Sequence, residues 1–136
     1  MRMHISMRVD DLAESIKFYS ALFNHAPSFV QENYAKWDVE NPMVNFVIES
    51  VADSKAAGVD HFGIQVEDAD QLHAISNRMS ESGHAYLGVE RGTCCFADIE
   101  KSWVKGAAGE KWETFLTHSQ TSDKYGEDRE HQLDAM

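Results

Sequence analysis

The sequence contains an internal repeat, and this feature constrains the fold more than any other. Residues 4–11 align with residues 61–68, so that each copy starts with a histidine and ends with an aspartate. In both copies apolar and polar residues alternate, and a helical pattern follows. A unit of this length rarely closes a core alone, so we expect the two copies to pair, within one chain or across a homodimer.

Each copy leads into an amphipathic helix. Apolar residues recur every three or four positions, which is the period of a helix with one buried face. They are Leu12, Ile16, Tyr19 and Phe23 in the first copy and Leu72, Ile75 and Met79 in the second. Asp11 with Glu14, and Asp68 with Gln71, match the capping box that starts a helix. We expect the second helix to end at Gly83.

Three strand-like runs follow each helix. They are Ser28 to Gln31, Tyr34 to Glu40 and Val44 to Glu49 in the first half, and Ala85 to Val89, Thr93 to Ile99 and Lys111 to Thr117 in the second. The order in each half is βαβββ. This order predicts a single α+β domain over residues 1–117, with modules at about 1–56 and 57–117.

The charge of the chain excludes several partners. A formal net charge of -11 repels nucleic acid and anionic membranes, so we expect neither to bind. No apolar run approaches the roughly 18 residues that span a bilayer, and the first residues lack a secretory signal. We therefore expect a cytoplasmic protein. The acidic residues 118–136 contain few large apolar side chains, which predicts a disordered tail.

The two cysteines, Cys94 and Cys95, are adjacent. A disulfide between neighbours would be strained and would close no loop, so a disulfide framework is excluded. Two neighbouring thiols are instead a candidate chelate for a soft metal or metalloid, and the alternative is a pair of small buried apolar residues. Since neighbouring residues of a regular strand face opposite sides, a chelate needs a backbone irregularity, for which Gly92 is a candidate.

Strand parity brings three metal-ligating residues to one side of the predicted sheet. His4 and His61 lie opposite the apolar residues of their strands, which should face the helices. Glu113 shares a face of the last strand with Phe115 and Thr117. Two histidines and one carboxylate form the facial triad that binds Fe(II) and leaves positions open for substrate and oxygen. We therefore predict His4, His61 and Glu113 as metal ligands.

The other histidines have no counterpart in the repeat, and we expect them to be structural or exposed. They are His25, His73, His84, His118 and His131. Asn45 occupies the position in the first half that Glu113 occupies in the second. An amide at this position favours three protein ligands over four.

Several motifs resemble those of the vicinal oxygen chelate superfamily, which includes glyoxalases, extradiol dioxygenases and bleomycin-resistance proteins. The broad resemblance covers about residues 3–117 and rests on the histidine strands, on residues 18–23 and on Trp112-Glu113. A narrower resemblance, to organoarsenical carbon-arsenic lyases and cadmium-induced proteins, rests on residues 34–37, 45–46, 93–97 and 101–104. The family tends to have Asp-Pro-x-Gly where this chain has Gly106-Ala107-Ala108-Gly109, a change that should loosen the turn.

The resemblance implies a glyoxalase-like fold and an Fe(II)- and O2-dependent lyase that converts trivalent organoarsenicals to arsenite. It maps the metal positions onto His4, His61 and Glu113 and the arsenic-binding positions onto Cys94 and Cys95. It implies no catalytic residue beyond the metal ligands. Nearby cations should favour the thiolates, and the candidates are Arg91, Lys101 and Lys105.

Two other functions stay open at this stage. One is a non-catalytic binder of Cd(II), As(III) or another thiophilic species, which needs the cysteines but no turnover. The other is a glyoxalase-like isomerase or lyase that uses Zn(II) or Ni(II), against which Asn45 argues because it replaces a fourth ligand.

Overall fold

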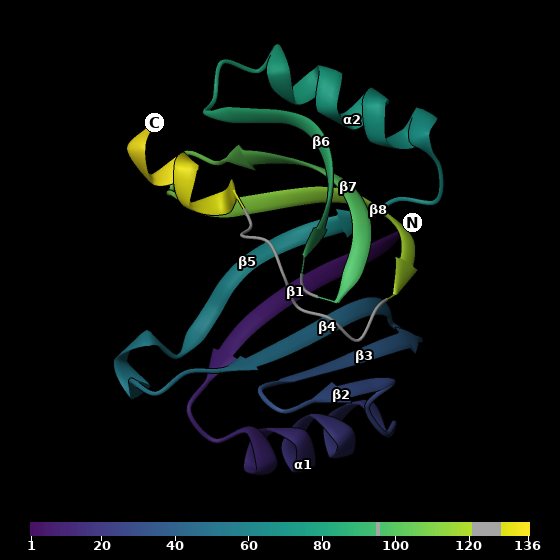
Figure 1. The fold of residues 1–136 in the computed structure, drawn as a ribbon, viewed down its shortest axis with the longest axis vertical. Helices are drawn as coiled ribbons and strands as arrows, with labels where there is room; N and C mark the ends of the chain where they lie inside the picture. Colours follow the sequence, from purple (N-terminus) through teal and green to yellow (C-terminus); the bar gives the residue numbers. More distant parts are fainter. Residues whose placement is uncertain (95, 121–128) are drawn as a thin grey trace. The chain divides into compact units, whose positions relative to one another are not determined.

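A computed structural model describes the chain except for residue 95 and residues 121–128 (Figure 1). The chain divides into two compact units, Arg2–Phe62 and Gly63–Met136, the second of which also includes Met1. The elements follow the order βαβββ twice, which confirms the predicted α+β fold class. Strand β5 (Gly58–Gln65) runs through the boundary between the units.

The first unit contains one helix and a small sheet. Its elements are β1 (Arg2–Val9), α1 (Leu12–Phe23), β2 (Phe29–Gln31), β3 (Tyr34–Glu40), β4 (Met43–Ser50) and the short 3-10 helix η1 (Ser54–Ala56). The strands lie in the order β2-β3-β4-β1, and β5 follows β1. β1 is parallel to β4, whereas the β2-β3 and β3-β4 pairs are antiparallel.

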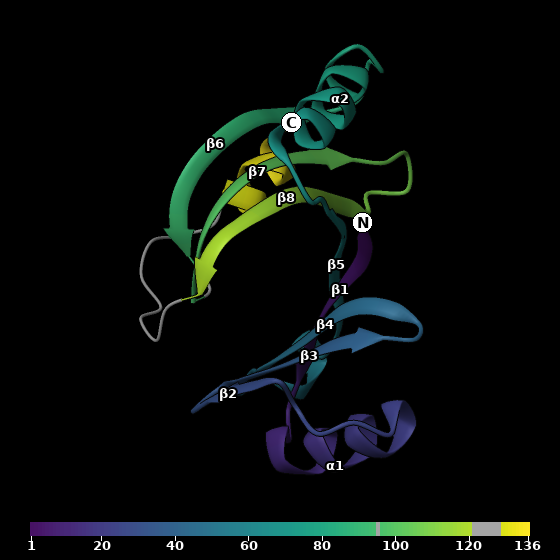
Figure 2. The same cartoon turned by 90° about the vertical axis from the view of Figure 1, so that its right-hand side faces the viewer.

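One face of this sheet packs against α1, which Figure 2 shows beneath β2, β3 and β4. Ile5 and Met7 of β1 contact a core that includes Trp37, Phe46 and Ile48. The predicted apolar stripe of α1 lies against the same core, and its members are Leu12, Ile16, Tyr19 and Phe23. The parity predicted for β1 is therefore confirmed, because the side chains that alternate with Ile5 and Met7 point away from α1.

The two aspartate caps are also confirmed. Asp11 accepts a hydrogen bond from the backbone N–H of Glu14 at 3.1 Å, and Asp68 accepts one from that of Gln71 at 2.8 Å. Such a cap satisfies a backbone donor that has no partner within the helix. The Glu14 carboxylate pairs with Lys17 at 3.1 Å.

The second unit has the same kind of architecture. Its elements after β5 are α2 (Ala69–Ser80), β6 (Tyr86–Cys94), β7 (Ala97–Lys105), β8 (Lys111–Gln120) and the 3-10 helix η2 (Arg129–Ala135). β8 lies between β5 and β7, and β6 forms the edge next to β7. Leu72 and Ser76 are the buried residues of α2, and the Ser76 hydroxyl hydrogen-bonds to that of Tyr86 on β6.

The predicted strand boundaries are wrong between residues 85 and 105. We expected strands at 85–89 and 93–99, but β6 continues through Gly92 to Cys94, and β7 follows from Ala97. Cys94 pairs with Ala97, and Phe96 adopts a positive φ of 66°. A bulky residue rarely takes this conformation, so no residue type here indicated a turn. The predicted end of α2 is also wrong, because we expected the helix to end at Gly83 and it ends at Ser80.

The turn at Gly106 to Gly109 is closed by backbone hydrogen bonds. The N–H of Gly109 donates to the carbonyl of Gly106 at 3.0 Å, and the N–H of Gly106 donates to the carbonyl of Glu110 at 2.8 Å. Gly109 has a φ of 87°, which glycine adopts without steric cost. These contacts order the turn without the proline that the family motif has.

The described part of the C-terminal segment differs from the disorder that we expected. Residues Arg129–Ala135 form η2, and the Leu133 side chain is fully buried. Residues 121–128 of the predicted tail lie outside the described residues. The segment is polar on average, but the buried Leu133 side chain anchors it to the rest of the unit.

None of the helices in the described ranges is long and apolar enough to cross a membrane.

The packing of α2 predicts the cost of a core substitution. Leu72→Ala should lower the free energy of unfolding by about 2–5 kcal/mol, because a fully buried leucine leaves a cavity when it is truncated. Urea denaturation followed by circular dichroism measures this change. The neighbouring His73→Ala is the control, since His73 is exposed on the same helix. Equal stabilities of the two variants would contradict the packing described for α2.

Candidate metal centre

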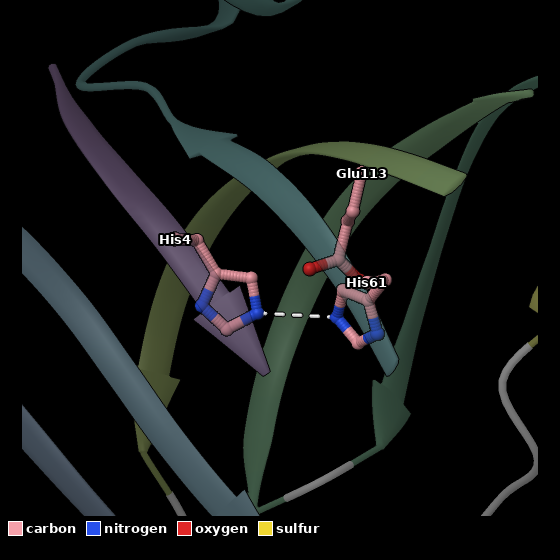
Figure 3. Close-up of side chains that lie close together, drawn as sticks. All are labelled: His4, His61 and Glu113. Carbon is pink, nitrogen blue, oxygen red and sulfur yellow. Dashed lines mark hydrogen bonds between the residues drawn. The ribbon is translucent and has the colours of Figure 1, made fainter. Parts of the chain in front are cut away.

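The two repeat histidines face each other in the first unit (Figure 3). His4 lies on β1 and His61 on β5, and their Nε2 atoms are 3.2 Å apart. Two neighbouring imidazole nitrogens bound to one metal at about 2.0–2.1 Å lie about 2.8–3.4 Å apart, from the octahedral to the tetrahedral angle. The observed separation falls within this range. The pair therefore has the spacing that a shared metal ion requires.

The other ring nitrogen of each histidine is held by an acceptor. His4 Nδ1 lies 3.0 Å from the backbone carbonyl of Asn45 and 3.3 Å from its side-chain oxygen. His61 Nδ1 lies 2.7 Å from the carboxylate of Asp60. A carbonyl and a carboxylate only accept, so both Nδ1 atoms donate. In the neutral rings both Nε2 atoms then carry lone pairs, and these lone pairs face each other.

This pattern is the one found around metal-bound histidines. Ligating imidazoles almost always donate their second N–H to a carboxylate or a backbone carbonyl, which fixes the ring and its tautomer. When one Nε2 carries a proton, this 3.2 Å contact is the hydrogen bond drawn in Figure 3. When neither does, the two lone pairs repel each other, and a cation bound by both nitrogens would remove the repulsion. The donor set of His4 and His61 therefore fits a divalent metal ion.

Asp60 is itself held in place. Its second carboxylate oxygen accepts from Arg8 at 2.8 Å, so the chain Arg8, Asp60 and His61 is continuous. The side chains of Asp60 and His61 are 13% and 12% exposed, so water weakens their interaction little. Arg8 lies on β1 next to the strand of His61, and it thereby links the two histidine strands.

Glu113 lies on β8 of the second unit, and Figure 3 also draws it. It pairs with Lys101 of β7, with Nζ 2.8 Å from Oε2, and the two side chains are 6% and 9% exposed. The register sets Lys101 opposite Phe115 and Trp103 opposite Glu113, so Lys101 and Glu113 share one face. The predicted common face of Glu113, Phe115 and Thr117 is confirmed.

The structure thus brings two of the three predicted metal ligands together within one unit. His4 and His61 meet, and both are held by acceptors. Glu113 is buried in the other unit, and a lysine holds its carboxylate in a defined position.

The cysteine pair lies at the end of β6. Cys94 is the last residue of this strand, and its backbone pairs with Ala97. Its side chain, and Cys95 as a whole, lie outside the described residues. The β6-β7 register does contain an irregularity, but it falls between Leu87 and Glu90 and not at Gly92.

The three cations predicted to favour the thiolates all contact other groups. Arg91 pairs with Asp98 at 3.1 Å, and this hydrogen bond lowers the pKa of the Asp98 carboxyl and raises that of Arg91. Lys101 pairs with Glu113, and Lys105 donates to the carbonyl of Leu133 at 2.8 Å. The role of these cations in activating a thiol stays a prediction.

Sequence reasoning missed the residues that orient the ligands. Asn45 was weighed only as a replaced ligand, yet it pairs with His4 across the β1-β4 register. Asp60 precedes His61, and neighbours in a strand face opposite sides, so parity alone excluded it. Lys101 was considered only as a partner of the thiols. The Asp60-His61 dipeptide is a local signal for this role, but Glu130-His131 carries the same pattern, so the dipeptide alone does not identify it.

The remaining histidines behave largely as expected. His118 pairs with Glu100 at 2.8 Å, and His25 Nδ1 hydrogen-bonds to the carbonyl of Ala26. The other three are exposed, namely His73, His84 and His131.

Residues 3–113 match the sequence profile of the Glyoxalase/Bleomycin resistance protein/Dioxygenase superfamily. The chain belongs to this superfamily. A "Trivalent organoarsenical cleaving enzyme" from Thermomonospora curvata is 37% identical over 115 residues, which are 85% of this chain and 76% of the relative. "Cadmium-induced protein CadI" from Mycobacterium bovis is 35% identical over 124 residues, 88% of this chain and 80% of that protein.

A solved structure supports the fold. An extradiol ring-cleaving dioxygenase from B. fuscum matches with a TM-score of 0.66 and 17% identity, over 90% of this chain and 34% of the dioxygenase. The resemblance seen in the sequence and the predicted glyoxalase-like fold are thus confirmed.

The support that Asp60 gives to His61 leads to a metal-binding prediction. Asp60→Ala should weaken Co(II) binding by about 10–100-fold, the loss typical when a group that orients a metal ligand is removed. Isothermal titration calorimetry at neutral pH measures the affinity. Asp38→Asn serves as the control, because Asp38 is a more exposed aspartate of the same unit that pairs with Lys36. Unchanged affinity in Asp60→Ala would show that His61 is not a ligand or does not need this support.

Proposed function

We propose that His4, His61 and Glu113 together bind one divalent metal ion, and that this ion is Fe(II). The observation that carries the proposal is the pair of Nε2 atoms 3.2 Å apart, each in a ring that donates through Nδ1. A carboxylate added to two imidazoles gives the facial donor set typical of non-haem Fe(II) oxygenases. Zn(II) and Ni(II) are alternative occupants of the same donor set.

The proposed reaction is the O2-dependent cleavage of the carbon-arsenic bond of trivalent organoarsenicals, which releases arsenite. The names of the relatives support this substrate class. Besides the Thermomonospora curvata protein, a "Trivalent organoarsenical cleaving enzyme" from Bacillus sp. is 38% identical over 115 residues.

We assign substrate binding and redox chemistry to two separate groups of residues. Cys94 and Cys95 are proposed to capture trivalent arsenic, since soft thiolates bind a soft metalloid. Bound Fe(II) would supply the activation of O2. His4 and His61 would stay in position through their Nδ1 hydrogen bonds, and Lys101 would orient the Glu113 carboxylate through the 2.8 Å ion pair.

A second candidate function is a non-catalytic binder of a thiophilic metal or metalloid. Its support is the 35% identity to "Cadmium-induced protein CadI". This function needs the cysteine pair alone. The orienting contacts around His4 and His61 favour the enzyme, because a thiol-based binder gains nothing from them.

We further propose that the protein acts in the cytoplasm as a homodimer, with modules at about residues 1–56 and 57–117. Its proposed partners are O2 and a small organoarsenical. Size-exclusion chromatography with light scattering tests the dimer directly.

The activity is tested by a turnover assay with and without air. The Fe(II)-loaded protein should release arsenite from trivalent phenylarsenical in air and none under argon, as measured by arsenic speciation with liquid chromatography and mass spectrometry. Cys94→Ser should weaken substrate capture and leave Co(II) affinity within about threefold of the wild type, because hard N/O ligands and soft thiolates select different ions. His61→Ala should abolish turnover and leave arsenic binding intact.

The same assay separates the alternatives. Stoichiometric arsenic binding without any arsenite release, together with no effect of His61→Ala, would favour the binder. Arsenite release at the same rate under argon would exclude an O2-dependent lyase and favour the glyoxalase-like lyase that uses Zn(II) or Ni(II) without O2. His73→Ala, an exposed histidine on α2, should behave as the wild type in every arm.

A further inference from the structure

The C-terminal residues 129–136 dock on the strands of the second unit. Lys105 of β7 donates to the carbonyls of Leu133 at 2.8 Å and Met136 at 3.1 Å. Lys111 of β8 pairs with Asp134 at 3.0 Å. Leu133 is fully buried. The segment is therefore bound through both charged contacts and an apolar anchor.

Strand parity identifies the face on which the segment lies. Lys105 and Lys111 are opposite each other in the β7-β8 register, so they project from one face. Lys111 and Glu113 are two residues apart on β8 and share that face. The segment thus docks on the face that carries Glu113.

Arg129 extends the contact toward the Glu113 ion pair. Its guanidinium pairs with Glu90 at 2.8 Å and donates to the carbonyls of Gly88 at 2.9 Å and Lys101 at 3.4 Å. Lys101 is the residue that holds Glu113. The segment therefore contacts both β6 and β7, and on β7 it reaches the backbone of the residue that holds Glu113.

The forces that hold the segment are individually weak. Ion pairs with exposed partners, such as Asp134 at 66% and Glu90 at 61% side-chain exposure, contribute little in water. A helix as short as η2 is unstable without tertiary contacts, so its order depends on docking. A short element that is docked on a sheet opens and closes more easily than the paired strands beneath it.

We propose that residues 129–136 form a reversible cover over the face of the β6-β8 strands that carries Glu113, and that this cover opens to admit a ligand. The contacts described above show the docking itself and need no assumption about function. The admission of a ligand rests on the proposed function, because it assumes that Glu113 binds the metal.

Hydrogen exchange and fluorescence quenching test the cover without any metal. In the wild-type protein the amides of residues 129–136 should exchange at least about tenfold more slowly than in the unfolded chain. Leu133→Asp should abolish this protection and raise the acrylamide quenching of Trp103, which is 1% exposed and shares the face of Lys101 and Lys105. Arg129→Ala is a milder second variant that should move both readouts in the same direction. Gln132→Ala, an exposed position of η2, is the control and should match the wild type.

Stopped-flow binding of Co(II) tests the admission of a ligand. Opening the cover should raise the association and dissociation rates by a similar factor, about tenfold, because a cover slows entry and exit alike and leaves the affinity unchanged. Equal hydrogen exchange in the wild type and Leu133→Asp would overturn the docking. Suppose that Leu133→Asp speeds the amide exchange of residues 129–136 but changes neither the quenching of Trp103 nor the rates of Co(II) binding. This result would overturn the cover. A change in exchange and quenching, but no Co(II) binding by any variant, would support the cover and overturn the proposed metal role of Glu113.

Discussion

The approach of two imidazole nitrogens to 3.2 Å is the constraint on which the account of this protein depends. It exists because the chain repeats one βαβββ pattern and sets a histidine at the same parity in the first strand of each copy. Each ring is locked by an acceptor at Nδ1, a carbonyl for His4 and the Asp60 carboxylate for His61. Rings locked in this way direct both Nε2 atoms toward one point, where a cation could accept the lone pairs of both nitrogens.

The carboxylate of the proposed centre is held by an ion pair instead of a hydrogen bond to a neutral or acidic acceptor. Glu113 is buried, and Lys101 compensates its charge across two strands of the second unit. A buried carboxylate without such a partner would be costly, so the ion pair explains why Glu113 can lie in this position at all. Membership of the superfamily explains the fold but not the chemistry, since related folds carry different reactions. The chemistry must be argued from the donor set and from the residues that orient it.

Much of this arrangement could be predicted from the sequence because it follows from short-range periodicity. The repeat and the strand parity were sufficient to find His4 and His61, and spacing alone found the aspartate caps. The β6-β7 turn was missed because it depends on Phe96, a residue type that seldom adopts positive φ. The docking of Leu133 was missed because composition averages over a segment, whereas one buried side chain decides whether it docks. Asn45 and Asp60 were missed because their roles depend on which atoms meet in space.

The most direct test of the central claim is the X-ray absorption spectrum of the Fe(II)-loaded protein, compared with that of His61→Ala. The account predicts a first shell of nitrogen and oxygen atoms at about 2.0–2.2 Å, with scattering from two imidazole rings in the wild type and from one in the variant. A shell that contains sulfur at about 2.3 Å, or imidazole scattering unchanged by the loss of His61, would contradict it.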